Sequence, residues 1–187
     1  MLQLRSQASV RRAVLGLAML LVSTSALQAT PARDEFCKRY PAECAVSLDE
    51  ETKIELDNAL WDLIDHVNRD VNHTIIQLTD MEHWGVPDRW DFAEDGRGDC
   101  EDMQLLKRKR LREAGIPQRA MRLAIVRDET GAGHAVLVIR TSNDGDWVLD
   151  NRANEIRHLQ DTGYTFTEIE SAYSSDLDPI INVATLK

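Results

Sequence analysis

Three residues of this 187-residue chain are of the types that perform nucleophilic catalysis together: Cys100, His134 and Asp150. A cysteine nucleophile needs a base to take its proton, and the base needs a group that orients it. Cys100 lies where a helix is expected to begin, and the free N–H groups there lower the pKa of a thiol and can hold an oxyanion. His134 begins one expected strand and Asp150 ends the next. The three residues therefore predict a cysteine-nucleophile site.

Carboxylates flank this cysteine in the sequence GDCEDM, residues 98–103. Asp99, Glu101 and Asp102 have two interpretations. In the first they cap the helix and fill its first turn, where acids interact favourably with the helix dipole. In the second they bind a hard cation, and calcium suits such oxygen ligands better than zinc does. Without a cation, these charges raise the pKa of Cys100 and oppose its thiolate.

Other catalytic and ligand-binding patterns do not occur in the sequence. The remaining histidines have no companion at metal-ligand spacing, and Cys37 and Cys44 are too far apart for a zinc knuckle, so no zinc site is expected. There is no glycine-rich phosphate loop and no nucleophile-elbow serine. The formal net charge of −10 at pH 7 argues against a nucleic-acid partner.

Strands must bring His134 and Asp150 together. Alternating apolar residues and turn signals predict four strands, at 119–128, 134–141, 146–151 and 163–170. The SNDG turn makes the second and third of them antiparallel neighbours. Direct pairing of His134 with Asp150 would centre this hairpin on residue 142, about one or two residues before the centre of the turn signal. A bulge or a skewed contact would have to absorb the difference.

Two helices are expected before these strands. A capping box at Ser47 and Glu50, followed by apolar residues at three- and four-residue steps, predicts a helix over about 48–71. A second helix begins at Asp99 or Cys100 and ends at Gly115. Its expected core-facing residues are Cys100, Met103, Leu106, Leu111 and Ala114.

The segments between these helices indicate how the chain is organised. The run KRKR at 107–110 is interpreted as mostly a solvated helix face, with apolar stems covering the surface below. Residues 79–98 contain two tryptophans, which favours an ordered loop over a linker. Helices followed by consecutive strands indicate an α+β domain with an antiparallel sheet.

Residues 1–29 differ in pattern from the rest of the chain. Three arginines precede a short apolar stretch, Ala13 to Val22, and small residues follow it, with cleavage after Ala26 or Ala29. The apolar stretch is about half of the roughly twenty residues that a membrane span needs. We therefore expect a signal peptide at 1–29 and a single exported domain at 30–187, with an uncleaved anchor as the alternative.

Export has a consequence for the three cysteines. In an oxidising compartment the close pair Cys37 and Cys44 can form a disulfide. Cys100 is then left unpaired, which in an exported protein indicates an intermolecular bond or a reactive thiol.

Several separated motifs give the chain a family resemblance. The segments GDCED, LLKRKRLREAGIP, GHAVLVIRT and WVLDN occur in an order that resembles the bacterial transglutaminase-like cysteine peptidases, the family of the LapG-related periplasmic proteases. The resemblance covers about residues 36–170. It implies a papain-like/transglutaminase-like core, with N-terminal helices and the cysteine-bearing helix packed on an antiparallel β-sheet.

The resemblance also implies roles for the site residues. Cys100 is then the nucleophile, His134 the general base and acid, and Asp150 the group that orients the imidazole. By the same resemblance the acids beside the cysteine bind calcium, and these are Asp99, Glu101 and Asp102.

The function implied is that of a periplasmic, calcium-assisted cysteine endopeptidase. Its partners would be a protein substrate such as a surface adhesin and a membrane-bound regulatory receptor. The N-terminal cysteine pair is typical of a branch with unassigned substrates, so the chemistry is better supported than the substrate. Two alternatives remain: a transglutaminase or amidase that uses the same three residues for acyl transfer, and a non-catalytic calcium-binding module.

Overall fold

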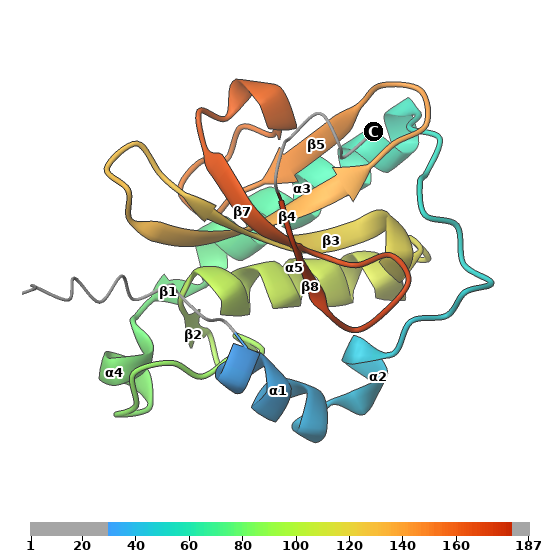
Figure 1. Cartoon of the computed structure of the whole chain (residues 1–187). Helices are drawn as coiled ribbons and strands as arrows, with labels where there is room; N and C mark the ends of the chain where they lie inside the picture. The colour runs from blue at the N-terminus through green and yellow to red at the C-terminus, as the bar shows by residue number, and fades with distance from the viewer. Residues whose placement is uncertain (1–29, 181–187) are drawn as a thin grey trace, which may run out of the picture.

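The computed structural model describes residues 30–180, so the predicted signal peptide at 1–29 lies outside the described residues. The described chain forms a six-stranded sheet with long helices packed against one of its faces (Figure 1). Within residues 30–180, no helix combines the length and the apolar character that crossing a membrane requires. The predicted α+β class with an antiparallel sheet is confirmed.

The elements follow one another as predicted, helices first and strands afterwards. The helices are α1 (Thr30–Arg39), α2 (Pro41–Cys44), α3 (Asn58–Thr74), α4 (Asp80–His83) and α5 (Cys100–Glu113). The strands of the large sheet are β3 (Met121–Arg127), β4 (Gly133–Arg140), β5 (Asp146–Leu149), β6 (Arg157–His158), β7 (Thr165–Glu170) and β8 (Leu177–Pro179). They are ordered β6-β5-β4-β3-β7-β8, and every neighbouring pair is antiparallel. A separate parallel pair, β1 (Ile76–Gln77) and β2 (Arg97–Gly98), precedes α5.

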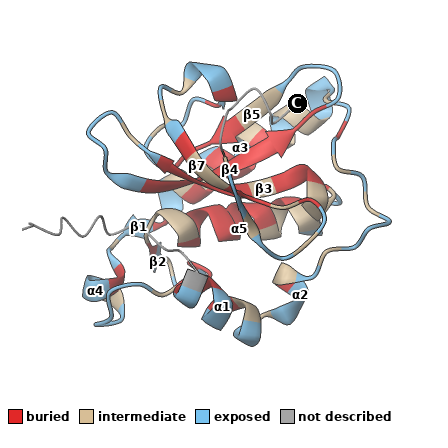
Figure 2. Ribbon diagram, in the orientation of Figure 1, coloured by how far each residue is buried: buried red, intermediate tan, exposed pale blue. Residues whose placement is uncertain are grey.

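Helix α5 is enclosed by the sheet and by the other helices. Met103 and Leu106 pack in the core that α3 shares with the sheet. Leu105 packs with Phe36 of α1 and Leu123 of β3 in a second core. Figure 2 shows the buried residues running along α5, β3 and β4. Because α5 is packed on several sides, its N-terminus is fixed relative to the sheet.

The second predicted helix is confirmed as α5. It begins at Cys100, and Gly115 follows its end with φ of 98°, the left-handed conformation expected of a helix-terminating glycine. The expected core-facing residues Met103 and Leu106 are buried, but Ala114 is exposed, because it lies past the last turn of the helix.

The interpretation of the KRKR run as a solvated face is wrong for its first half. Lys107 is 0% and Arg108 2% exposed, whereas Lys109 and Arg110 remain partly exposed. Helix α5 is packed on the sides that carry Lys107 and Arg108, and it reaches solvent where Lys109 and Arg110 lie. Arg108 is paired with a buried carboxylate, whereas the Lys107 ammonium group has no hydrogen-bond partner among the described residues.

The first helix was predicted over about 48–71, and in the structure it begins about ten residues later. Helix α3 starts after Asp57, whose carboxylate accepts a backbone N–H of the first turn. Upstream of it the chain forms turns and bends, and Ile54 pairs with the residue that follows β4. The predicted capping box at Ser47 and Glu50 is therefore wrong, because sheet pairing of this stretch outweighs its helical signal.

All four predicted strands are present, as β3, β4, β5 and β7. The two-residue β6 and three-residue β8 were not predicted, since such short segments carry no periodic signal. The predicted disulfide between Cys37 and Cys44 is also present, and it joins α1 to α2.

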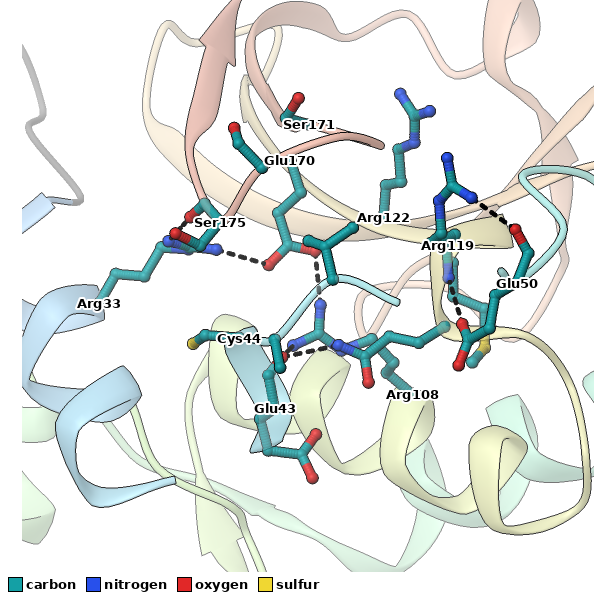
Figure 3. A pocket seen from close by; sticks show the side chains of 15 residues that line it. Arg33, Glu43, Cys44, Glu50, Arg108, Arg119, Arg122, Glu170, Ser171 and Ser175 are labelled. Carbon is teal, nitrogen blue, oxygen red and sulfur yellow. Dashed lines mark hydrogen bonds and ion pairs between the residues drawn. The ribbon is translucent and has the colours of Figure 1, made fainter. Parts of the chain in front are cut away.

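Arg108 is buried because it belongs to an ion network around Glu170 of β7. Figure 3 shows Arg33 of α1 and Arg108 of α5 reaching this carboxylate from two sides, at 3.2 Å and 2.5 Å. The backbone N–H of Leu123 adds a third hydrogen bond at 3.0 Å. Burial alone would raise the pKa of Glu170, but the two arginines hold it below its ordinary value. The network ties the N-terminal helices to α5 and to the sheet.

Replacing Glu170 by alanine is therefore expected to lower the free energy of unfolding by about 3–5 kcal/mol, because two buried guanidinium groups lose their partner. Denaturant unfolding followed by circular dichroism measures the change. The matched control is Glu155→Ala, which removes an exposed ion pair with Arg157 and should change stability by less than about 1 kcal/mol. Equal effects of the two substitutions would contradict this role of Glu170.

Candidate active site and metal centre

Cys100 is the first residue of α5 and lies beside β4. It packs against the core that contains Ala135, and the backbone N–H of Ala135 points to its sulfur atom. Its thiol donates a hydrogen bond to Oε2 of Glu101 at 3.0 Å. Burial, together with the charges of Glu101 and Asp99, raises the pKa of Cys100 well above that of an ordinary thiol. In this arrangement the thiol stays protonated at neutral pH.

His134, the neighbour of Ala135, is hydrogen-bonded to Asp150. Its Nε2 lies 2.8 Å from Oδ1 of Asp150, and the two residues are 3% and 7% exposed. Asp150 is the acceptor, because its pKa is about 2 and it is ionised at neutral pH. The second ring nitrogen, Nδ1, is therefore the one left to exchange a proton with a nucleophile.

The strand register explains how His134 and Asp150 meet. The hairpin pairs Leu137 with Leu149 and Val138 with Val148, without a register shift between β4 and β5. Asp150 follows β5 by one residue, so continued pairing would set it two residues from His134, on the same face of the sheet. Side chains in this diagonal position remain within reach of each other. The skewed contact, and not a bulge, resolves the register difference that the sequence left open.

The Asp150 carboxylate has further partners besides His134. The hydroxyl of Tyr164 donates to Oδ2 at 2.6 Å, and the backbone N–H of Arg152 donates to Oδ1 at 3.0 Å. Burial alone would raise the pKa of Asp150, but these hydrogen bonds and that of His134 lower it to about 2. Burial and the same carboxylate raise the pKa of Tyr164 to about 12, so its hydroxyl remains a donor. Asp150 is held ionised and in a fixed orientation.

Tyr164 was not singled out from the sequence, where it is one residue of a predicted strand. Its replacement by phenylalanine removes one hydrogen bond from Asp150 and so loosens the orientation of the carboxylate that is bonded to His134. We expect the rate at which iodoacetamide alkylates Cys100 at pH 7 to fall about fivefold. Tyr173→Phe, at a 75% exposed position, is the control and should leave the rate unchanged. If both variants react like the original protein, Tyr164 has no influence on the site.

Carboxylates form two overlapping groups beside Cys100. Asp80, Asp99 and Asp102 have oxygen atoms within 4.8 Å of one another, and so do Asp80, Asp88 and Glu101. The two groups together contain the three acids predicted from the sequence, and Asp80 belongs to both groups. Asp80 and Asp88 were not predicted, because they lie 11 to 22 residues upstream, in the loop at 79–98, where no spacing rule points to a ligand.

This arrangement fits a calcium ion in three respects. Calcium binds oxygen at about 2.3–2.6 Å, so oxygens that share one ion lie within about 5 Å of one another, as they do here. Oδ1 of Asp80 and Oδ1 of Asp99 are buried without any hydrogen-bond partner. Burial and mutual repulsion raise the pKa of Asp99 to about 9 and that of Asp102 to about 8. A cation bound between these carboxylates would contact the unpaired oxygens, offset the repulsion and lower the pKa values.

The helix-cap explanation accounts for less of the geometry. Asp99 is the N-cap residue of α5, but its side chain makes no capping hydrogen bond. Asp102 lies in the first turn, yet its Oδ1 accepts the backbone N–H of Asp91 at 2.7 Å, a contact to the loop. The carboxylates are therefore oriented toward the loop and one another, more than toward the end of their own helix.

Short secondary structure holds the loop against α5. Strand β1 precedes the loop and β2 ends it, and the two strands pair in parallel, so both ends of the loop are held side by side. Thr79 and Glu82 form a reciprocal capping box at the start of α4, which fixes Asp80. A Cβ atom on Gly98 would lie 2.7 Å from Cβ of Asp102, so only glycine permits this close approach of β2 to the helix. The predicted ordered loop is confirmed.

Comparisons with known proteins agree with this geometry. The sequence profile of the family described as bacterial transglutaminase-like cysteine proteinase matches residues 24–179. No curated protein matches the sequence.

Solved structures of LapG from Legionella pneumophila resemble the fold. The calcium-bound form superposes with a TM-score of 0.56 at 22% identity, over 66% of this chain and 70% of LapG. The EGTA-treated form gives 0.52 at 22% identity, over 60% and 64% of the two chains. A third LapG structure gives 0.53 at 20% identity, over 68% and 72%.

Proposed function

Because the chain belongs to the bacterial transglutaminase-like cysteine proteinases, we propose that it is an exported, calcium-dependent endopeptidase whose catalytic residues are Cys100, His134 and Asp150. The observation that carries the proposal is the 2.8 Å hydrogen bond between His134 and an ionised Asp150, next to the residue whose N–H faces the Cys100 sulfur. A nucleophile, a base and an orienting group are the complete set that this chemistry requires.

The reaction follows from the positions of these groups. Nδ1 of His134 takes the proton of Cys100, and the thiolate attacks the carbonyl carbon of a peptide bond. The free N–H groups at the start of α5 hold the resulting oxyanion. His134 then donates its proton to the leaving amine, which departs and leaves a thioester on Cys100. His134 next removes a proton from water, whose oxygen attacks the thioester and releases the second product.

Calcium is the proposed cofactor, and its ligands come from Asp80, Asp88, Asp99, Glu101 and Asp102. When bound, it supplies the positive charge that offsets these carboxylates. Glu101 has two competing partners, the Cys100 thiol and the other acids of its group. A cation held by Glu101 and the other acids would compete with the hydrogen bond that Glu101 accepts from the Cys100 thiol. The comparison of calcium-bound and EGTA-treated LapG supports the same cofactor here.

The proposed location is the periplasm, supported by the signal-like pattern at 1–29 and by the Cys37–Cys44 disulfide. The proposed substrate is a protein exposed at the cell surface, such as an adhesin, and a membrane receptor is the proposed regulator. These partners rest on the family resemblance alone.

One experiment tests the reaction directly. The exported and surface proteins of a strain with the original enzyme are compared, by mass spectrometry of their N-termini, with those of a Cys100→Ala strain. Peptide hydrolysis predicts new N-termini only where the cysteine is present. Cross-linked or deamidated glutamine in place of new termini would instead establish acyl transfer, and identical patterns in both strains would overturn the proposal.

A further inference from the structure

Lys107 is a buried cation without a hydrogen-bond acceptor among the described residues. It lies on α5 two helical turns after Cys100 and is 0% exposed. Burial lowers the pKa of Lys107 to about 7, and the carboxylate of Asp150 is the charge that opposes this change. An ammonium group removed from water needs acceptors for its protons. The groups around it should therefore supply them.

Three side-chain amides occupy the same helix interface, Asn68 and Asn72 of α3 and Gln104 of α5. All three donate N–H groups to the segment 150–154. Asn72 donates to the carbonyl oxygen of Asp150 at 2.8 Å. Asn68 and Gln104 donate to residues later in the segment at 3.1 Å and 3.3 Å. This amide cluster thus holds the segment that begins with the carboxylate bonded to His134.

The oxygen atoms of the same three amides accept no hydrogen bond. Oδ1 of Asn68, Oδ1 of Asn72 and Oε1 of Gln104 are all buried without a donor. Helix α3 ends just before β1, which pairs with β2 immediately before α5, so the two helices are antiparallel and pack together (Figure 1). Lys107 follows Gln104 by three residues, and therefore lies on the same face of α5. An ammonium group has three protons to donate, and three acceptors lie at this interface.

We propose that Lys107 is a positioning residue: its ammonium group binds the oxygen atoms of the amide cluster through enclosed water, and so fixes the segment that presents Asp150 to His134. The amides can then hold the segment with their N–H groups without leaving their oxygens unpaired. The protonated form of Lys107 also places a positive charge near the ionised Asp150. This inference rests on the proposed roles of His134 and Asp150.

Lys107→Met tests the proposal, because methionine keeps the length of the side chain and removes its protons. With the surface protein identified by the terminus comparison as substrate, we expect kcat to fall about 10- to 100-fold through misplacement of Asp150. KM should change by less than about twofold, since no group that contacts substrate is altered. Lys109→Met, two residues away and partly exposed, is the control and should retain full activity. Unchanged kcat in Lys107→Met would overturn the proposal.

A double-mutant cycle separates positioning from a general packing defect. Asn68→Leu removes one amide of the cluster, and its effect on kcat should overlap with that of Lys107→Met, because both substitutions break one network. The double variant is then expected to be about as slow as the slower single variant. Fully additive losses would mean that Lys107 acts without the amide cluster, and would contradict the proposal.

A measurement that needs no substrate keeps this inference distinct from the proposed function. In the Cys100→Ala protein, proton NMR follows the exchange with water of the Nε2 proton that His134 donates to Asp150. Lys107→Met in this background should speed the exchange about tenfold, because the Asp150 segment is loosened. Unchanged exchange would overturn the positioning role even in an active enzyme. If the original protein cleaves no substrate, the peptidase proposal fails, but faster exchange in the Lys107→Met variant would still support the positioning role.

Discussion

Cleavage is expected to fall by at least about 10⁴-fold when Cys100 is replaced by alanine, because the proposed covalent intermediate forms on its sulfur atom. The variant should fold normally, since Cys100 is partly buried at a helix start and alanine keeps its backbone position while removing only the contacts of the thiol with Glu101 and with the backbone N–H of Ala135. Kinetics of peptide hydrolysis and thermal unfolding of the same preparation measure the two effects.

The companion substitution His134→Ala should cost a similar factor, and the double variant should be little worse than either single variant. Residues that act as one unit show this loss of additivity. Should Cys100→Ala retain cleavage while His134→Ala loses it, the nucleophile would have to be another group. If Cys100→Ala does not fold, the cysteine is needed for the structure. The catalytic role is then tested by His134→Ala.

Calcium removal is the second change with a large expected effect. At a calcium concentration about a hundred times Kd, binding stabilises the folded state by about 3 kcal/mol, which for a domain of this size is about 10 °C in Tm. Addition of EGTA should reverse this gain and stop cleavage. The variant Asp80→Asn, which weakens the ligand shared by both carboxylate groups, should behave like the chelated protein in the presence of calcium. The exposed Asp34→Asn is the matched control.

The pH dependence of the chelated protein follows from the raised pKa values. Asp99 and Asp102 titrate near pH 9 and pH 8 in the fold, and near pH 4 in the unfolded chain. Between these limits the folded state holds more protons than the unfolded state, so stability falls as pH rises from about 4 to about 9.

Calcium should abolish this decline, because it stabilises the ionised carboxylates, and its binding at pH 7 should release protons. Thermal melts across this pH range with calcium or EGTA, and calorimetry in buffers of different ionisation enthalpy, measure both effects. A metal-free protein whose Tm rises between pH 5 and pH 8 would show that these acids are not a strained cluster. Binding without proton release would count against them as ligands.

The sequence predicted the elements that carry strong periodic or terminal signals. Helix α5 and the strands β3, β4, β5 and β7 lie where hydrophobic alternation, glycine and helix-start residues placed them. The capping-box signal at Ser47 misled, because Ile54 forms backbone hydrogen bonds with residues at and after the end of β4, which a local pattern cannot express. Likewise, the charges at 107–110 appear solvated until the packing of α1 and α3 around α5 is known.

The site residues divide in the same way. Cys100, His134 and Asp150, the proposed catalytic residues, could be selected from the sequence, because each lies at the end of an element whose type and order could be read from it. Asp80 and Tyr164 were not, since their roles depend on a loop closed by β1 and β2 and on the path of the chain after β6. Contacts between segments far apart in the chain have no signature in residue spacing.

The hydrogen bond from Cys100 to Glu101 also bears on the chemical durability of the enzyme. Only the thiolate form of cysteine reacts readily with peroxide or with another disulfide. While Glu101 holds the proton on sulfur, the thiol is shielded from sulfenic acid formation and from exchange with the Cys37–Cys44 bond. If the chain is exported and calcium activates Cys100, as proposed, the chain would keep this thiol reduced until the metal binds, and the thiol would become vulnerable to oxidation only in the active form.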